Sequence, residues 1–443
     1  MVCVRCILQV VLLASAAAKI SYFWHITDIH LDVDYSEKGD PRKNCWHSRG
    51  GGRDTVGKFG HYSCDSPWSL VHSAAKLMKT RSAEDVEFVL WTGDGLSVMS
   101  SSRSSEKQVA ALQNLTHLFS LTFPSQFVFP ALGHDDPGGN LGERLSYHEL
   151  ASFWQQWLPT EALQTFNKGG YYTIEQADHK LRIIALNTNL FSSPERGEVQ
   201  LNWLTEVLEK SQILREKVYI VGHMGPGPDE RQPDTMPHFS EEAARRYLAL
   251  VRRFSDIIAG QFFGHLHSDT FRLVYNHAAR PVSWMLMAPS LSPRRTNGGA
   301  NNPGLRLYKF NKDTGQVLDY TQFYLDLSLA NERGKAEWRL EYNFTSYYGL
   351  TNISAGSLHE LAASFRHDTR AFDKYYQANS VRLPVGHCDD SCTHTHYCAT
   401  TRVEYSEFRH CLDAAASALA SGCPAFTAGL FVLMAFSLSS IVT

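Results

Sequence analysis

Residue types that bind metal ions recur just beyond short apolar runs along most of this chain. Short apolar runs bounded by glycine predict buried strands, and α/β sheets bind ligands beyond the carboxyl ends of their strands. The sequence therefore predicts one sheet edge where carboxylates and imidazoles gather and hold metal. The residues are Asp28 and His30 after run 22–26, Asp94 after 87–91, His134, Asp135 and Asp136 after 127–132, His223 after 218–221, and His265 and His267 after 257–263.

The composition bounds the class of protein. The 443 residues, with 43% hydrophobic and 20% charged side chains, suit a large globular chain of more than one domain. A formal net charge of -3 provides no basic footprint, so we expect no nucleic-acid duplex as a partner. Nothing in the sequence signals a homodimer, and we expect a monomer.

The N-terminus has the pattern of a secretory signal peptide over residues 1–18. Arg5 provides the positive start, residues 7–13 the apolar centre, and the alanines at 16–18 the cleavage site. The apolar stretch is too short for a membrane span. Three glycosylation sequons, at Asn114, Asn343 and Asn352, agree with a secreted protein.

The C-terminus has a second hydrophobic segment. Small residues at 414–422 precede an apolar tail at 425–442, and no charged residue follows. This order predicts a glycosylphosphatidylinositol (GPI) anchor signal over 414–443. A plain membrane helix is the alternative, but the tail lacks the cytoplasmic Lys or Arg of a stop-transfer segment. We therefore expect the protein at the extracellular face of the cell membrane, anchored in the outer leaflet.

Cysteine parity agrees with export. Of nine cysteines, Cys3 and Cys6 leave with the signal peptide and Cys423 with the tail. Six remain, which suits three disulfides in an oxidising compartment. We expect Cys45 with Cys64 and two bridges among the C-terminal four, although the sequence leaves that pairing open. The six are Cys45, Cys64, Cys388, Cys392, Cys398 and Cys411; a zinc knuckle of Cys388, Cys392 and Cys398 with His394 and His396 is the alternative.

Strands and helices alternate between residues 19 and 329, which predicts one α/β domain. Loops rich in Gly, Pro and Asn interrupt it at 50–57, 137–142, 225–237 and 293–303. Loops beyond strand ends usually contact substrate. Residues 330–413 contain two sequons, many tyrosines and the cysteine cluster, and we expect a small helical subdomain stapled by disulfides.

The candidate ligands are sufficient for two divalent ions. Imidazole with carboxylate favours zinc, with manganese and iron as alternatives. Two ions close together can share a bridging carboxylate, an arrangement suited to in-line attack on phosphorus.

The order of these motifs resembles that of the calcineurin-like metallophosphoesterase superfamily. The segments 23–32, 64–68, 91–94, 186–190 and 260–267 narrow the resemblance to the acid sphingomyelinase-like phosphodiesterases. The first metal motif follows the signal peptide without a saposin domain, which favours the type 3 subfamily, and the anchor tail favours its B form. The resemblance implies a four-layer α/β/β/α sandwich, in which two sheets are flanked by helices.

The resemblance also implies roles for the candidate ligands. The activity implied is that of a phosphoric diester hydrolase, in which a metal-bound hydroxide attacks a nucleotide or phospholipid head-group diester. Asp94 would bridge the two ions. One ion would be held by Asp28, His30, Asp94 and His267, and the other by Asp94, His134, His223 and His265.

The third motif departs from the family pattern of Gly-Asn-His-Asp/Glu, since this chain has Gly133, His134, Asp135 and Asp136. Aligned without a gap, His134 replaces the metal-binding Asn, and Asp135 replaces the His that protonates the leaving group. Alternatively Asn is deleted and His134 remains the acid. We prefer the ungapped alignment, because a shortened strand-end turn would shift the whole site. Loss of a general acid typically slows catalysis roughly 100- to 10,000-fold.

Two functions are therefore open. One is an exported zinc phosphodiesterase of reduced activity. The other is a catalytically impaired, lipid-anchored surface protein that binds lipid or a partner and modulates signalling.

Overall fold

The structure is a computed structural model, and it describes residues 19–47, 56–81, 85–97, 105–136, 145–176, 180–295, 299–384 and 386–420. The expected signal peptide and the apolar tail from residue 421 lie outside these ranges. Within them, no helix is long and apolar enough to cross a membrane.

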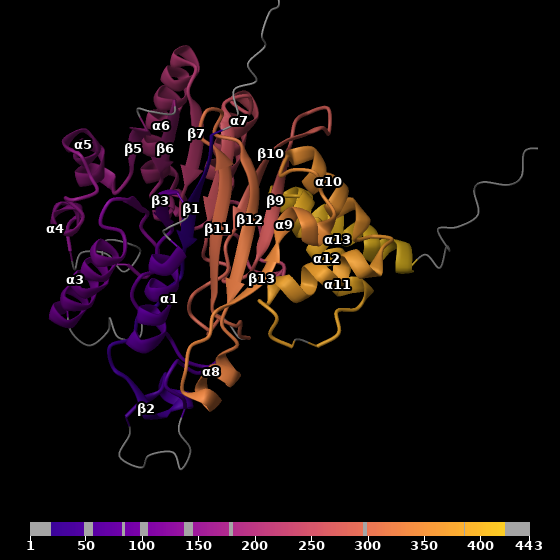
Figure 1. Cartoon of the computed structure of the whole chain (residues 1–443). Helices are drawn as coiled ribbons and strands as arrows, with labels where there is room; N and C mark the ends of the chain where they lie inside the picture. Colours follow the sequence, from indigo (N-terminus) through magenta and orange to yellow (C-terminus); the bar gives the residue numbers. More distant parts are fainter. Residues whose placement is uncertain are drawn as a thin grey trace, which may run out of the picture.

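Two six-stranded mixed sheets form the centre of the molecule (Figure 1). The first, in spatial order, consists of β13 (Arg339–Asn343), β12 (Val317–Tyr324), β11 (Gly304–Asn311), β1 (Ile20–Ile26), β3 (Val86–Trp91) and β4 (Phe127–Pro130). The second consists of β5 (Tyr172–Gln176), β6 (Leu181–Ala185), β7 (Lys217–Val221), β8 (Ile258–Phe263), β10 (Pro281–Met287) and β9 (Thr270–Tyr275).

Aromatic residues fill the space between the sheets. Phe23 of β1 meets Phe262 of β8 and Tyr219 of β7, with ring centroids 5.4 and 5.7 Å apart. All three side chains are fully buried. Burial of such rings provides much of the apolar stabilisation of a core.

Helices cover both outer faces (Figure 1). On the first sheet, Trp91 of β3 packs against Phe119 and Trp154. On the second, Leu204 and Tyr247 join a separate apolar cluster with Ile220 of β7. The helices are α1 (Trp68–Arg81), α3 (Ser105–Thr122) and α4 (Tyr147–Phe153) beside the first sheet, and α6 (Pro194–Leu214) and α7 (Glu241–Arg253) beside the second, while α5 (Thr160–Gly169) contacts α4 and the edge strand β5. The four-layer α/β sandwich is confirmed.

Strand direction brings the expected ligands to one edge. β1, β3 and β4 pair in parallel, as do β6, β7 and β8. The carboxyl ends of parallel strands lie at the same edge of a sheet, and the two sheets pack face to face. The loops after β1, β3, β4, β7 and β8 can therefore meet.

The C-terminal region is mostly helical and contains disulfides, as expected. Cys388 pairs with Cys392 and Cys398 with Cys411, so the zinc knuckle is wrong, since bridged sulfurs provide no thiolate ligands. The helices that gather beside β9 and β10 in Figure 1 are α9 (Phe344–Tyr348), α10 (Ala355–Ser364), α11 (Thr369–Asn379), α12 (Asp390–Thr401) and α13 (Tyr405–Ala420), whereas α8 (Leu327–Arg333) lies apart from them, near β2.

One strand of this region belongs to the first sheet. β13 pairs antiparallel with β12 across the expected boundary at residue 329. The boundary stays a prediction.

Glycosylation of the sequons also stays a prediction. Asn114 lies exposed on α3, whereas Asn343 ends β13, where its amide oxygen accepts a bond from Thr321 Oγ1 at 2.7 Å.

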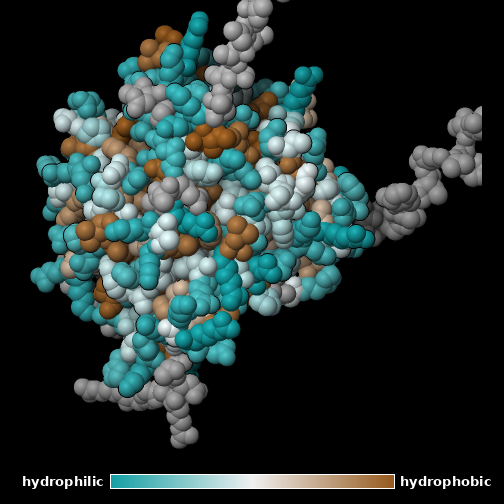
Figure 2. Space-filling view, in the orientation of Figure 1, coloured by the Kyte–Doolittle hydropathy of each residue, from teal (hydrophilic) through white to brown (hydrophobic). Residues whose placement is uncertain are grey.

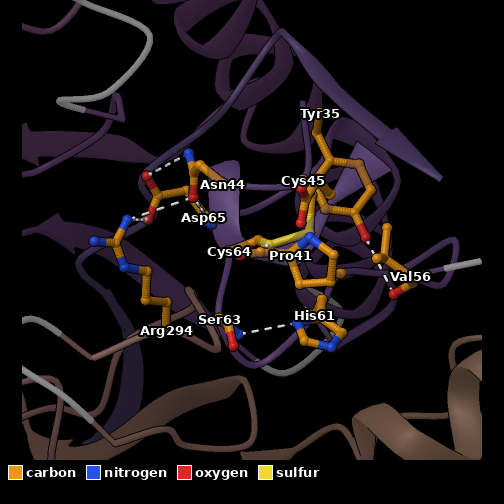
Figure 3. The surroundings of a disulfide bond; sticks show 12 residues. Tyr35, Pro41, Asn44, Cys45, Val56, His61, Ser63, Cys64, Asp65 and Arg294 are labelled. Atoms are coloured by element: carbon orange, nitrogen blue, oxygen red, sulfur yellow. Dashed lines mark hydrogen bonds and ion pairs between the residues drawn. A yellow bond between two sulfur atoms is a disulfide. The ribbon is translucent and has the colours of Figure 1, made fainter. Parts of the chain in front are cut away.

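The third disulfide, Cys45–Cys64, braces the long loop after β1 (Figure 3). This loop contains β2 (Tyr35–Asp40) and η1 (Pro41–Lys43). Beside the bridge, Asn44 Oδ1 accepts a bond from the Asp65 backbone N–H at 3.0 Å, and Asp65 lies 3.6 Å from Arg294. The bridge closes the loop on itself, and the ion pair of Asp65 with Arg294 joins this loop to the segment that follows β10.

Candidate metal centre

Two groups of potential ligands meet where the carboxyl ends of the strands converge. Within each group the ligand atoms lie within 4.8 Å of one another. The two groups follow the order of the sequence motifs, since each strand end contributes one or two members. The first group is Asp28, His30 and His267; the second is Asp94, His134, His223 and His265.

The backbone is unusual at these residues. Five of the seven have a positive φ, a left-handed conformation that is uncommon for residues other than glycine. Such outliers concentrate at functional sites, where the surrounding structure holds them in place. The angles are 49° at Asp28, 45° at His30, 50° at Asp94, 67° at His265 and 57° at His267.

One carboxylate oxygen of Asp28 lies in the site without a hydrogen-bond partner. Its Oδ2 accepts bonds from Thr27 Oγ1 at 2.7 Å and from the His265 backbone N–H at 2.8 Å. Its Oδ1 is buried and has no hydrogen-bond partner. That oxygen lies 3.3 Å from His267 Nε2 and 3.8 Å from His30 Nε2.

Asp94 repeats this arrangement between the two groups. Its Oδ1 accepts a bond from the Asp135 backbone N–H at 2.9 Å, while its buried Oδ2 has no donor in hydrogen-bonding geometry. Imidazole nitrogens surround Oδ2, with His134 Nδ1 at 2.9 Å, His223 Nε2 at 3.1 Å and His30 Nε2 at 3.7 Å. Asp94 is therefore placed to serve both groups.

Backbone carbonyls orient two of the imidazoles. His223 Nδ1 lies 2.8 Å from the Thr92 carbonyl oxygen, and His267 Nδ1 lies 2.8 Å from that of Arg294. A carbonyl accepts the Nδ1 proton, which leaves the Nε2 lone pair directed at the site. Metal-binding histidines are usually held in this way.

The carboxylates remain ionised despite full burial. Burial alone would raise the pKa of Asp94, but the charges of His223 and His134 outweigh it and hold this pKa well below its ordinary value. Conversely, burial would lower the pKa of His30, but the nearby carboxylates of Asp28 and Asp94 raise it to about 10. Two buried anions therefore require positive charge beside them, which divalent ions supply.

The donor set fits the ions that the resemblance implies. Buried carboxylate oxygens without partners and inward-facing imidazole nitrogens are the ligands preferred by zinc, and also by iron and manganese. The residues present can hold two such ions, with Asp94 shared.

The unusual third motif lies within this centre. His134 stands among the ligands of the second group, at the position that the ungapped alignment predicts for the Asn. Asp135 points back at the site, with Oδ2 3.6 Å from His30 Nδ1 and Oδ1 3.5 Å from His134 Nε2. This geometry is compatible with the ungapped alignment, and both the alignment and the chemical roles of the two residues stay predictions.

Asp136 is a residue whose role the sequence analysis missed. Its carboxylate accepts three backbone N–H bonds, from Asp94 and Gly133 to Oδ2 at 2.8 and 2.9 Å and from Gly95 to Oδ1 at 2.8 Å. Burial and the charge of Asp94 nevertheless raise its pKa to about 6. Asp136 thus joins the loops after β3 and β4. Its match to the acidic last residue of the family motif is the sequence signal from which this role could have been predicted.

The loop at 225–237 borders the centre, as expected for substrate contacts. With His238 and His265 it lines a cavity of about 110 Å³. His238 Nε2 is buried there without a partner, a feature that the sequence analysis did not single out. Of the other expected loops, 50–55, 137–142 and 296–298 lie outside the described residues.

Two family models cover nearly the whole of this chain. Calcineurin-like phosphoesterase matches residues 21–269, and acid sphingomyelin phosphodiesterase C-terminal region matches residues 280–418. Together they span the strands that supply the ligands and the disulfide-containing helices. The chain belongs to the acid sphingomyelinase-like phosphodiesterases.

Curated relatives align over most of their length. Human acid sphingomyelinase-like phosphodiesterase 3b is 35% identical over 90% of this chain and 91% of its own. Human cyclic GMP-AMP phosphodiesterase SMPDL3A is 34% identical over 89% and 90%. Sphingomyelinase phosphodiesterase C of Dictyostelium discoideum is 32% identical over 90% and 94%. The expected enzyme class, a phosphoric diester hydrolase, is thereby confirmed, and membership of the metallophosphoesterases implies a dinuclear metal centre.

Proposed function

We propose that this protein is an exported, zinc-dependent phosphodiesterase that acts on small phosphodiesters of the nucleotide or phospholipid head-group type. One observation carries the proposal. Asp28 Oδ1 and Asp94 Oδ2 are buried without hydrogen-bond partners among converging imidazoles. Buried charges without partners are costly unless an ion satisfies them.

The two ligand groups assign the ions. Asp28, His30 and His267 with Asp94 would hold one, and the second group would hold the other. When bound, two divalent ions polarise phosphoryl oxygens and lower the pKa of water enough to make a nucleophile near neutral pH. The names of the relatives support phosphodiester substrates, since they include a cyclic dinucleotide phosphodiesterase and a sphingomyelinase.

The chain's own residues fix this site before substrate arrives. Carbonyls of Thr92 and Arg294 orient His223 and His267, and Asp136 holds the loop that presents Asp94. Sites with such support need little reorganisation during the reaction, which is where much of catalysis arises.

Proton delivery to the leaving group is the weak step. On the ungapped alignment Asp135 takes the position of the family's proton donor. In the structure without ions, burial and the charge of Asp94 raise the pKa of Asp135, but bound cations would lower it and make this carboxyl a poor acid. We therefore expect slow turnover when the leaving group is an alkoxide. Nitrophenolate and pyrophosphate leaving groups need no proton and should suffer least.

The same feature supports a second candidate, a catalytically impaired surface protein that binds lipid or a partner and modulates signalling. Retained metal ligands do not exclude it, since an inactive centre can keep its ions. Turnover separates the two.

We further propose an extracellular location with a lipid anchor, and a monomeric state. Three disulfides support export, since such bridges persist in oxidising compartments. The sequence patterns at 1–18 and 414–443 support the leader and the anchor. Release of the protein from cells by a phosphatidylinositol-specific phospholipase would test the anchor, and retention after that treatment would contradict it.

The deciding experiment is turnover of bis-nitrophenyl phosphate by the purified mature protein with and without added zinc, beside Asp135→His. Zinc-dependent turnover in the wild type would support the enzyme. No wild-type turnover, with activity in the variant, would mean an intact centre that lacks its acid and would favour the second candidate. Inactivity of both with zinc bound would contradict the phosphodiesterase proposal.

A further inference from the structure

A larger cavity lies beside the C-terminal helices. It has a volume of about 440 Å³ and is bounded by the loop after β7, the segment after β10, and helices α11 and α12. Cavities of this size commonly hold small molecules. Its polar lining includes Glu230, Arg231, Arg295, Tyr376, Ser391 and His396.

Each carboxylate of the inner wall is already neutralised. Glu230 pairs with the buried Arg272 at 2.5 Å and accepts a bond from Asn379 at 3.2 Å. Asp229, which precedes it in the loop, pairs with Arg231 at 2.8 Å. These pairs leave no negative charge for a third arginine.

Arg295 is that third arginine. It is 7% exposed, and its donors reach only neutral acceptors, Asn301 Oδ1 at 2.6 Å and the Asn379 carbonyl at 3.1 Å. No ion pair joins it to any carboxylate of the described residues. Burial, together with the charge of Arg231, lowers the pKa of Arg295 to about 9. A buried cation without a counter-ion is costly, so an anion in the cavity would stabilise it.

Two further features suit an anion with an organic portion. Arg231 Nη1 is buried without a partner close to this wall. Tyr376 presents an aromatic ring that stacks on Phe372 with centroids 5.8 Å apart. Asp389 also lines the cavity, but it is exposed and caps α12 by accepting a bond from the Cys392 N–H at 2.8 Å.

We propose that this cavity binds the phosphate group of a small ligand, held by the guanidiniums of Arg295 and Arg231. Guanidinium forks match phosphate oxygens in charge and geometry. None of the candidate metal ligands lines this cavity, and the proposal stands whether or not the protein hydrolyses phosphodiesters. The competing explanation is that Arg295 serves only to bond Asn301 and the end of α11.

Ser391 allows a charge-specific test. It lies exposed at the cavity and in the first turn of α12, where an acidic residue favours the helix. Ser391→Glu would therefore place a negative charge at the site without weakening the fold, and Ser391→Gln is its uncharged control of similar size. Unchanged thermal unfolding in both variants verifies this.

The experiment is calorimetric titration of the purified, metal-loaded protein with inorganic phosphate and, separately, glycerol phosphate. Repeating it after chelation identifies heat that belongs to the metal centre. The remaining binding should weaken at least about tenfold in Ser391→Glu, because like charges repel at short range, and should persist in Ser391→Gln. Arg295→Gln should weaken it similarly. Binding of phosphate alone would indicate a free-phosphate site, and preference for the ester a phosphomonoester site. No binding of either probe, or equal affinities in all variants, would overturn the proposal.

Discussion

The two halves of the metal centre differ in how firmly their ligands are held. Asp28, His30 and His267 are almost fully buried, and backbone groups of His265 and Arg294 bond to Asp28 and His267. In the second half, Asp94 and His223 are fully buried as well, but the His134 side chain is 23% exposed and its Nε2 faces only Asp135. The departure from the family motif thus falls on the looser half, where a changed ligand disturbs least.

This difference predicts the largest effect for the residue that both halves share. Asp94→Asn should lose both ions and nearly all turnover, with a loss greater than the roughly 10- to 100-fold typical of residues behind the ligands. Metal analysis and turnover of bis-nitrophenyl phosphate would measure it. A variant that keeps two ions per chain would remove Asp94 from the bridging position.

Removing one ligand from each half compares them directly. His267→Ala should release the first ion, since the remaining ligands of that half are fixed in place and cannot move to replace the missing imidazole. His134→Ala should release the second, whereas His134→Asn, which restores the family ligand, should retain it. Metal stoichiometry after dialysis is the measurement, and loss of both ions from either alanine variant would show that the halves are not separable.

A smaller effect is expected behind the ligands. Asp136→Asn keeps the size of the side chain but has one carbonyl oxygen in place of two carboxylate oxygens for three backbone N–H groups. We expect metal affinity to fall about 10- to 100-fold, with the second half affected more. Competition with a zinc chelator would measure the metal affinity. Unchanged affinity would mean that the loop after β3 keeps its conformation without the Asp136 carboxylate.

The smallest effect on the metal should come from the disulfide beside the first half. A Cys45→Ser, Cys64→Ser double variant should lose about 3 kcal/mol of unfolding free energy, as expected for a closed loop of this length. Chemical denaturation would measure that loss. Both ions should remain bound below the transition, and their release from the folded protein would show that the bridge supports His267 through Arg294.

Much of this molecule could be predicted from its sequence, because strand-end ligands depend on local pattern. Parallel strands place Asp28, Asp94 and His223 at the same edge of the sheets, whatever conformation the connecting loops adopt. The bare oxygens of Asp28 and Asp94 could not be foreseen, since they depend on which backbone N–H groups reach the opposite oxygens.

The remaining surprises depend on contacts between distant segments. β13 joins the first sheet although its neighbours in sequence are helical, because the edge of β12 offers unpaired backbone groups. The arginines of the larger cavity have partners up to 84 residues away, as with Arg295 and Asn379. Pairings over such separations leave no periodic signal in a single sequence.

The exposure of apolar side chains also could not be predicted from the sequence. Figure 2 shows small, separate hydrophobic patches on a mostly hydrophilic face. Among the large apolar side chains of the described residues, Ile213 and Val199 on α6 have some of the highest exposed fractions. Helical spacing alone predicts an apolar stripe but not which neighbour will cover it.

The left-handed backbone at five candidate ligand positions has a consequence for folding. Such a conformation costs a residue other than glycine on the order of 1–3 kcal/mol. Aspartate and histidine at all five positions therefore make the folded state without ions less stable than glycine would, and bound ions would offset that cost.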